Sequence, residues 1–196
     1  RVIGGAVRPL AGLPRVLQWR AAALLRARGI EWLGGRRVEA VGAGFVRLDD
    51  GRELPARHTL LVTGAAAHPW LAASGLAVDE GGFVRVSRSL QSLSHPAVFA
   101  AGDCAAYADA RPKSGVYAVR AGPPLAENLL RALRGEALED WAPQRRALYL
   151  INTADGSALA AWGALAWWGG WVWRWKDRID RAFMARFTPD GDPPSV

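Results

Sequence analysis

Val98-Phe99-Ala100-Ala101-Gly102-Asp103, near the middle of the chain, is the stretch that says most about the fold. Apolar residues followed by Gly-Asp predict a buried strand that ends at the edge of a sheet. Open α/β sheets bind ligands at the edge formed by the carboxyl ends of their strands. Gly102 lets a ligand approach the backbone, and the Asp103 carboxylate can accept hydrogen bonds from sugar-like hydroxyls. The simpler alternative is a turn in which Asp103 only caps the local backbone.

The segment after this motif predicts a loop and then a long helix over 116–133. Arg111-Pro112-Lys113-Ser114-Gly115 ends the loop, and Gly115-Val116-Tyr117 begins the helix. The free N–H groups and positive dipole end of a helix favour negative charge, so this start could stabilise a reduced, anionic ring system. Lys113 is either a cation beside that ring or a solvent-exposed loop lysine.

The segments before and around the motif alternate between helical and extended patterns, which is typical of the α/β class. An apolar strand is predicted over His58–Thr63, ending at Gly64, and a turn over Asp49–Arg52. The other predicted elements are a buried strand over 1–7, a helix over 14–28, strands over 30–33, 37–41, 45–48 and 82–86, and a short helix over 70–74.

The last third of the chain predicts a β-hairpin and then an amphipathic helix. The hairpin strands cover 147–153 and 157–162. Six of the ten tryptophans lie between Trp162 and Trp175. A stripe at helical spacing follows, with basic residues largely beside it: Trp168, Trp171, Trp175, Ile179, Phe183 and Phe187.

Four interpretations of the segment Trp168–Phe187 are open. It can lie on an anionic membrane surface, or pack on protein, including at a dimer interface. A membrane span over 156–173 meets the bare length threshold, but four glycines and clustered tryptophans argue against it. Stacking on nucleic acid is the fourth, and because no nucleic-acid motif is present we expect no such partner.

Composition narrows the class of protein. The 196 residues are 51% hydrophobic and 22% charged, which excludes general disorder, and the net charge of +7 permits a nucleotide or an acidic membrane as partner. The single cysteine, Cys104, excludes a disulfide framework, and we expect it to be a buried structural thiol in a reducing compartment. His58, His68 and His95 have no metal-ligand spacing, so no metal site is expected.

Val98–Asp103 is similar to the second flavin-binding motif of the pyridine nucleotide-disulfide oxidoreductase superfamily. Its members have two dinucleotide-binding domains, one for FAD and one for NAD(P)H. In that family the aspartate hydrogen-bonds the ribityl chain of FAD, which implies this role for Asp103. Leu60-Leu61-Val62-Thr63-Gly64 resembles the Ala-Thr-Gly strand that closes the NAD(P)H domain, with Val62 in place of the alanine.

The resemblance is strongest to the type II NADH dehydrogenase-like branch. More narrowly, 111–128 and 173–184 resemble the flavoprotein module found alone or fused ahead of selenide, water dikinase. The type II enzymes attach peripherally to membranes through C-terminal amphipathic helices. Gly115-Val116 stand where the quinone-reducing branch usually has a glutamine, which argues against a quinone acceptor. The lone cysteine excludes dithiol–disulfide exchange within the chain.

The resemblance implies an incomplete flavoprotein. The family's first Gly-rich fingerprint is absent, because Gly4-Gly5-Ala6 lacks its spacing and context. We expect an α/β protein with the end of the NAD(P)H-binding domain over 1–66 and the second half of the FAD-binding domain over 67–135. The hairpin and amphipathic helix would cover 136–187, and a linker or tail 188–196.

The expected function is that of an FAD-dependent NAD(P)H dehydrogenase-like oxidoreductase, with the fragment alone inactive. Hydride would pass from the nicotinamide to the flavin and on to an unnamed acceptor. The alternative is a non-catalytic docking or regulatory module that binds a membrane or a fused selenide, water dikinase domain. The location implied is cytoplasmic, with peripheral attachment to the inner face of the membrane. The expected cofactor-binding residues are Thr63, Gly64, Gly102, Asp103, Lys113, Gly115, Val116 and Tyr117.

Overall fold

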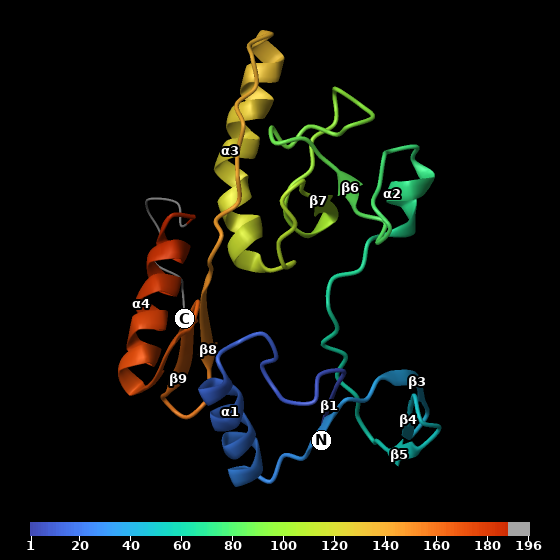
Figure 1. Ribbon diagram of the computed structural model, residues 1–196, viewed down its shortest axis with the longest axis vertical. Helices are drawn as coiled ribbons and strands as arrows, with labels where there is room; N and C mark the ends of the chain where they lie inside the picture. The colour runs from blue at the N-terminus through green and yellow to red at the C-terminus, as the bar shows by residue number, and fades with distance from the viewer. Residues whose placement is uncertain (188–196) are drawn as a thin grey trace, which may run out of the picture. The chain divides into compact units, whose positions relative to one another are not determined.

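The computed structural model describes residues 1–187, which form two compact units (Figure 1). The first unit combines residues 1–60 with the described residues from 148 onward, and the second comprises residues 61–147. Both units mix helices and strands, which agrees with the predicted α/β class. The linker or tail predicted over 188–196 lies outside the described residues.

The core of the first unit is a three-stranded antiparallel sheet. Its strands β8 (Leu148–Asn152), β9 (Ala158–Trp162) and β10 (Leu165–Gly169) follow one another in space as in sequence. The hairpin of β8 and β9 confirms the prediction. The sequence does not predict the third strand, because Trp168 also fits the helical spacing of the segment that follows.

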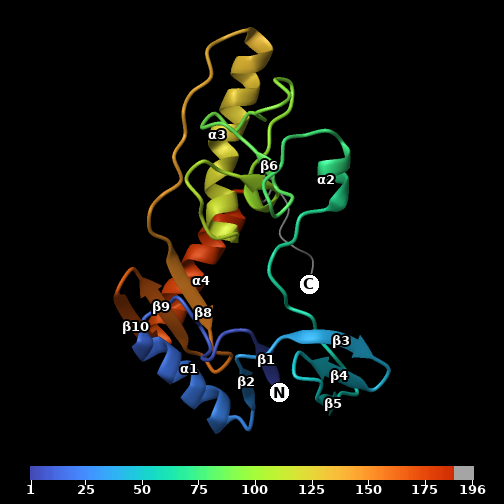
Figure 2. The ribbon, with the colours of Figure 1, turned by 45° about the vertical axis from the view of Figure 1, so that its right-hand side comes forward.

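Two helices cover opposite faces of this sheet (Figure 2). Residues alternate between the faces of a strand, so neighbours in β9 pack on different helices. Leu159 contacts Leu17 of α1 (Arg15–Ala27), whereas Ala158 and Ala160 contact Val172 of α4 (Gly170–Ala185). Leu17 and Val172 are both fully buried, so each helix is anchored by an aliphatic residue in its first turn.

The Trp-rich helix begins later than predicted. Trp168 belongs to β10, because the helix α4 starts only at Gly170. The Trp168 ring lies on the α1 side, with the Arg20 guanidinium 4.8 Å from its centroid. The predicted stripe from Trp168 to Phe187 is therefore wrong at its first member, and its last member, Phe187, lies beyond the end of the helix. No helix among residues 1–187 is both long and apolar enough to cross a membrane.

The remaining strands of the first unit are short. β1 (Val2–Gly4) pairs in parallel with β2 (Trp32–Gly34). β3 (Val38–Gly42), β4 (Phe45–Leu48) and β5 (Glu53–Pro55) form an antiparallel meander, with the predicted turn between the last two. The buried strand predicted over 1–7 is wrong in length and burial, because β1 has one neighbouring strand and no residue of it is fully buried.

The strand predicted over His58–Thr63 does not form. The stretch is irregular, and Leu60, Leu61 and Val62 are 86%, 65% and 84% exposed. A strand needs a neighbour to satisfy its N–H and C=O groups, and no strand of residues 1–187 lies beside this segment. The boundary between the two units falls here, after Leu60.

The second unit contains two helices and a pair of short parallel strands. Its elements are α2 (Pro69–Ala73), β6 (Val84–Arg85), the 3₁₀ turn η1 (Gly102–Cys104), β7 (Ala105–Ala106) and α3 (Gly115–Arg134). The core is formed by Leu71, Val84, Val86, Ala100 and Ala105. The predicted helices over 70–74 and 116–133 are confirmed within a few residues, because their signals are local.

The motif is extended over 98–101, where it is not a regular strand, and turns at Gly102 and Asp103 into η1. Phe99 makes one isolated bridge with Gln91, and the Ala100 N–H donates to the Leu90 carbonyl at 3.0 Å. Ala100 is buried, as predicted. The prediction of a continuous buried strand is wrong, because this segment makes only isolated bridges and backbone hydrogen bonds with its neighbours.

Candidate functional site

The predicted site centres on the turn η1 and the start of α3, both in the second unit. Gly102 has φ +74°, a left-handed conformation that favours glycine. A Cβ on Gly102 would lie 3.3 Å from the Ala118 Cβ, so the turn is packed directly on α3. The Gly102 N–H donates to the Tyr107 hydroxyl at 2.7 Å. A glycine is therefore required both by the backbone conformation and by the close approach.

Asp103 stands at the exposed side of this turn. Its carboxylate makes no hydrogen bond or ion pair with another group in residues 1–187. The alternative in which Asp103 caps the local backbone is therefore not observed. The carboxylate oxygens are available to accept hydrogen bonds from hydroxyl groups of a ligand.

Lys113 is held beside the turn and is not an exposed loop lysine. Its Nζ donates to the Ala105 carbonyl and lies 4.0 Å from the centroid of the Phe83 ring. Burial lowers the pKa of the Lys113 ammonium, and the negative charges of Asp79 and Asp103 oppose that shift. The side chain thus supplies a positive charge at a defined place next to Asp103.

The start of α3 offers unpaired polar groups. Ser114 precedes the helix, and its carbonyl accepts from the N–H groups of Tyr117 and Ala118 at 3.0 and 3.2 Å. Gly115 and Val116 contribute N–H groups that precede the first helical hydrogen bonds. The Ser114 Oγ and Arg111 Nε atoms are buried without a hydrogen-bond partner. The free N–H groups of the helix start, with the cation of Lys113, suit a ligand that carries oxygens and negative charge.

The structure brings most of the predicted residues together. Contacts between η1 and α3 join Gly102 and Asp103 to the helix start, where Gly115, Val116 and Tyr117 lie. Thr63 and Gly64 are exposed in the irregular stretch, and no contact described for residues 1–187 joins them to this cluster.

Tyr107 is a site residue that the sequence did not reveal. Burial raises the pKa of its hydroxyl, although the hydrogen bond from Gly102 acts in the opposite direction. The ring also packs edge-on against Trp141, with centroids 5.5 Å apart. No motif marks this tyrosine, because its role depends on how the chain returns toward Gly102.

Cys104 differs from its predicted environment. The thiol is exposed, and its Sγ donates to the Ala101 carbonyl at 3.2 Å. The prediction of a buried structural thiol is wrong, because the 3₁₀ turn directs this residue outward. In the described part of the chain, no group of three histidine, cysteine or acidic residues is placed to hold a metal ion.

Comparison with solved structures supports the fold. The chain is similar to the sulfide:quinone oxidoreductase from the hyperthermophilic bacterium Aquifex aeolicus, with a TM-score of 0.73 and 18% identity over 94% of this chain and 48% of that one. It is also similar to a NAD-dependent persulfide reductase from A. fulgidus, with a TM-score of 0.61 and 22% identity over 83% of this chain and 31% of that one. A third structure is the ferredoxin reductase for the CYP199A2 system from Rhodopseudomonas palustris, with a TM-score of 0.60 and 22% identity over 81% and 40%.

The chain spans less than half the length of each of these proteins. A sequence model of the pyridine nucleotide-disulphide oxidoreductases matches residues 1–122, which is more than half of the chain and includes the turn η1 and the start of α3. The predicted resemblance is thereby confirmed at the level of the superfamily. The chain belongs to the pyridine nucleotide-disulphide oxidoreductase family.

Proposed function

We propose that this chain is part of an FAD-dependent NAD(P)H oxidoreductase. The observation that carries the proposal is the turn at Gly102-Asp103, which packs on the start of α3 with a free carboxylate. Bound FAD would supply the acceptor for a hydride from reduced nicotinamide and would pass the electrons to a further acceptor. The chain alone is expected to be inactive, since it spans less than half of the related structures.

Each residue of the cluster has a defined role in this proposal. Asp103 accepts hydrogen bonds from the ribityl hydroxyls of FAD, and Gly102 lets the cofactor approach the backbone. Lys113 and the helix start at Gly115, Val116 and Tyr117 favour negative charge on the reduced flavin. Lys113 can do so because Ala105 holds its ammonium group in place.

The division into cofactor domains extends the proposal. We assign residues 1–66 to the end of the NAD(P)H-binding domain and residues 67–135 to the second half of the FAD-binding domain. Thr63 and Gly64 then lie where the first domain passes to the second. The apolar run that precedes them is exposed, as expected for a strand that pairs only within a complete sheet.

The flavin content of the purified full-length protein tests the proposal. Visible absorption in the flavin bands is expected, and no such absorption after addition of FAD would overturn it. Asp103→Asn should weaken FAD binding about 10- to 100-fold, the value of a charged hydrogen bond. Asp109→Asn removes the same charge from an exposed position of the adjoining loop and should leave binding unchanged. Equal effects of the two changes would remove Asp103 from the site.

Docking is a second candidate role, and one observation favours it. The helix α4 leaves Trp171 48% exposed, in a groove that also contains arginines. A membrane surface, a second copy of the chain and a fused selenide, water dikinase domain are the candidate partners. The role is compatible with a cytoplasmic protein attached peripherally to a membrane. Deleting 168–187 would remove Val172 from the core, so point substitutions on the helix surface are the better test.

A further inference from the structure

The turn η1 is closed by a hydrogen bond to a side chain five residues further along the chain. The Gly102 N–H donates to the Tyr107 hydroxyl at 2.7 Å. Gly102 has no Cβ to restrict the rotation of its backbone, so its conformation at φ +74° depends on contacts from outside the residue. The Tyr107 hydroxyl supplies one such contact. It therefore helps to fix the backbone immediately before Asp103.

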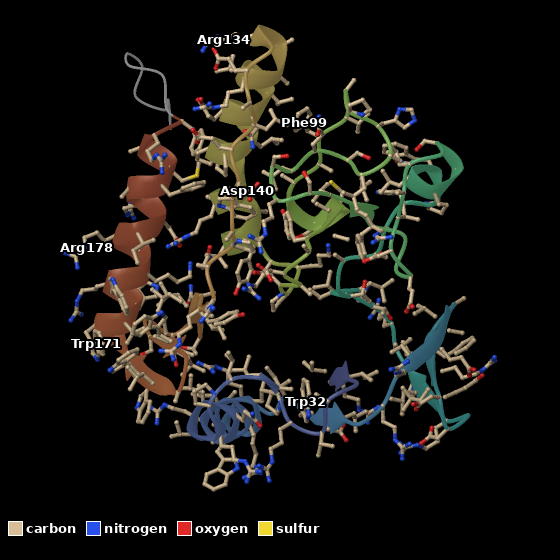
Figure 3. All side chains as sticks on the ribbon, turned by 45° about the horizontal axis from the view of Figure 1, so that its top comes forward. Trp32, Phe99, Arg134, Asp140, Trp171 and Arg178 are labelled. Carbon is tan, nitrogen blue, oxygen red and sulfur yellow. The ribbon has the colours of Figure 1, made fainter. Side chains whose placement is uncertain are left out.

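Tyr107 is itself held by the second unit. Its ring packs against the core of that unit and meets the Trp141 ring edge-on, with centroids 5.5 Å apart and an angle of 70° between the planes. The Trp141 N–H donates to the Arg88 carbonyl at 2.9 Å. Figure 3 shows Asp140, the residue before Trp141, beside α3. The hydroxyl that accepts from Gly102 is thus carried by a ring with contacts on more than one side.

The other end of the turn is held independently. Ala105 is fully buried, and it pairs with Val84 in the parallel ladder of β6 and β7. The Ala105 carbonyl also accepts a hydrogen bond from Lys113. Among residues 102–107, only Asp103 and Cys104 are exposed. The Asp103 carboxylate is therefore presented from a short segment between two supports, of which the Tyr107 hydroxyl is the first.

We propose that Tyr107 is a positioning residue that holds Asp103 ready for its ligand. The inference rests on the proposed function, in which Asp103 accepts hydrogen bonds from the ribityl hydroxyls of FAD. Tyr107 acts through the Gly102 N–H and needs no contact with the cofactor. An acceptor that is fixed before binding loses less conformational freedom when the ligand arrives. Without the hydroxyl, the Gly102 N–H would lose its partner and the turn could reorient.

Titration of the FAD-free full-length protein with FAD, followed by flavin fluorescence, tests the proposal. Tyr107→Phe keeps the ring and its contact with Trp141 and removes only the hydroxyl. It should raise the dissociation constant of FAD about fivefold, the value of one neutral hydrogen bond. The matched control is Tyr149→Phe, which removes a hydroxyl from β8 of the first unit and should leave FAD binding unchanged.

A double-mutant cycle with Asp103 separates positioning from a purely structural role. Asp103→Ala removes the group that Tyr107 is proposed to position. In that background, Tyr107→Phe should change the dissociation constant of FAD less than about twofold. A general loosening of the fold, or a direct contact between the hydroxyl and FAD, would instead weaken binding by the same factor in both backgrounds. That result would overturn the proposal, as would unchanged FAD binding by Tyr107→Phe alone.

A second variant keeps the test decisive if the first one does not fold. Trp141→Leu retains the Tyr107 hydroxyl but removes the ring that supports it, so it should weaken FAD binding with Asp103 present and not with Asp103→Ala. Thermal unfolding without FAD shows which variants are folded. If the unsubstituted protein binds no FAD, the oxidoreductase proposal fails together with this inference. If it binds FAD and the effects of the two sites multiply, only the role of Tyr107 fails.

Discussion

Gly102→Ala adds one methyl group at the turn where Asp103 is presented. The change affects both the backbone conformation of the turn and its packing against α3. Gly102 has φ +74°, where a residue with a Cβ is strained, and the new Cβ would lie 3.3 Å from the Ala118 Cβ of α3. The flavin proposal adds a third effect, because the methyl would occupy space that the cofactor needs at the backbone.

Comparison with a second glycine separates the two contributions to the free energy cost, the backbone strain and the close contact. Gly135, which ends α3, has φ +70°, and a Cβ there would meet nothing within 4 Å. Gly135→Ala should therefore cost only the left-handed strain, about 1–2 kcal/mol. Gly102→Ala should cost that amount plus about 1 kcal/mol for the contact with Ala118, the low end of the range for overpacking.

Urea denaturation of the two variants measures the difference. The free energy of unfolding should fall by about 2–3 kcal/mol for Gly102→Ala and by about 1–2 kcal/mol for Gly135→Ala. In the full-length protein, Gly102→Ala should lower FAD occupancy and Gly135→Ala should not. A larger loss of stability for Gly135→Ala would refute the packing argument, and equal FAD occupancy would refute the placement of the cofactor at this turn.

Three further predictions concern stability and its dependence on pH. Val172→Ala should lower the free energy of unfolding by about 2 kcal/mol in urea denaturation, because this fully buried side chain joins α4 to the sheet. Asn128→Ala should cost about 3 kcal/mol in the same assay, since the buried amide makes three hydrogen bonds with main-chain groups. Hydrogen bonding to Thr153 and then the charge and hydrogen bond of Arg28 lower the pKa of Asp155 below its usual 3.8, so its stabilising effect is present above that pH and is lost as pH falls through the lowered pKa. Asp155→Asn should therefore make the thermal midpoint fall less steeply below about pH 4.

The helices could be predicted because their signals are local. Pro14 precedes α1 and Gly29 lies just beyond its end, while Gly135 in a left-handed conformation follows the last residue of α3. The predictions of strands over 58–63 and 98–101 were less accurate than those of the helices. An apolar run forms a strand only when another strand lies beside it. The sequence of the run contains no information about that neighbour.

The candidate site was predictable to the extent that it is contiguous in sequence. Asp103 follows directly from the motif, and Lys113 precedes a helix that the pattern predicts. The hydrogen bond from Gly102 to Tyr107 and the tethering of Lys113 to Ala105 depend on the folded path of the chain. The sequence therefore indicates the residues of the turn and of the helix start, whereas Tyr107 and the defined position of Lys113 are seen only in the fold.

The Trp-rich segment shows how the type of secondary structure changes a functional interpretation. If the whole segment formed one helix, Trp168 and Trp171 would share an apolar stripe. Because β10 is a strand, Trp167 and Trp168 instead project to opposite faces, so Trp168 meets Arg20 and Trp167 joins the groove beside α4. Residues four apart on a helix lie on one side, so Arg174 and Arg178 border that groove together. A uniform stripe would present only apolar groups to a docking partner, whereas this arrangement also presents two positive charges.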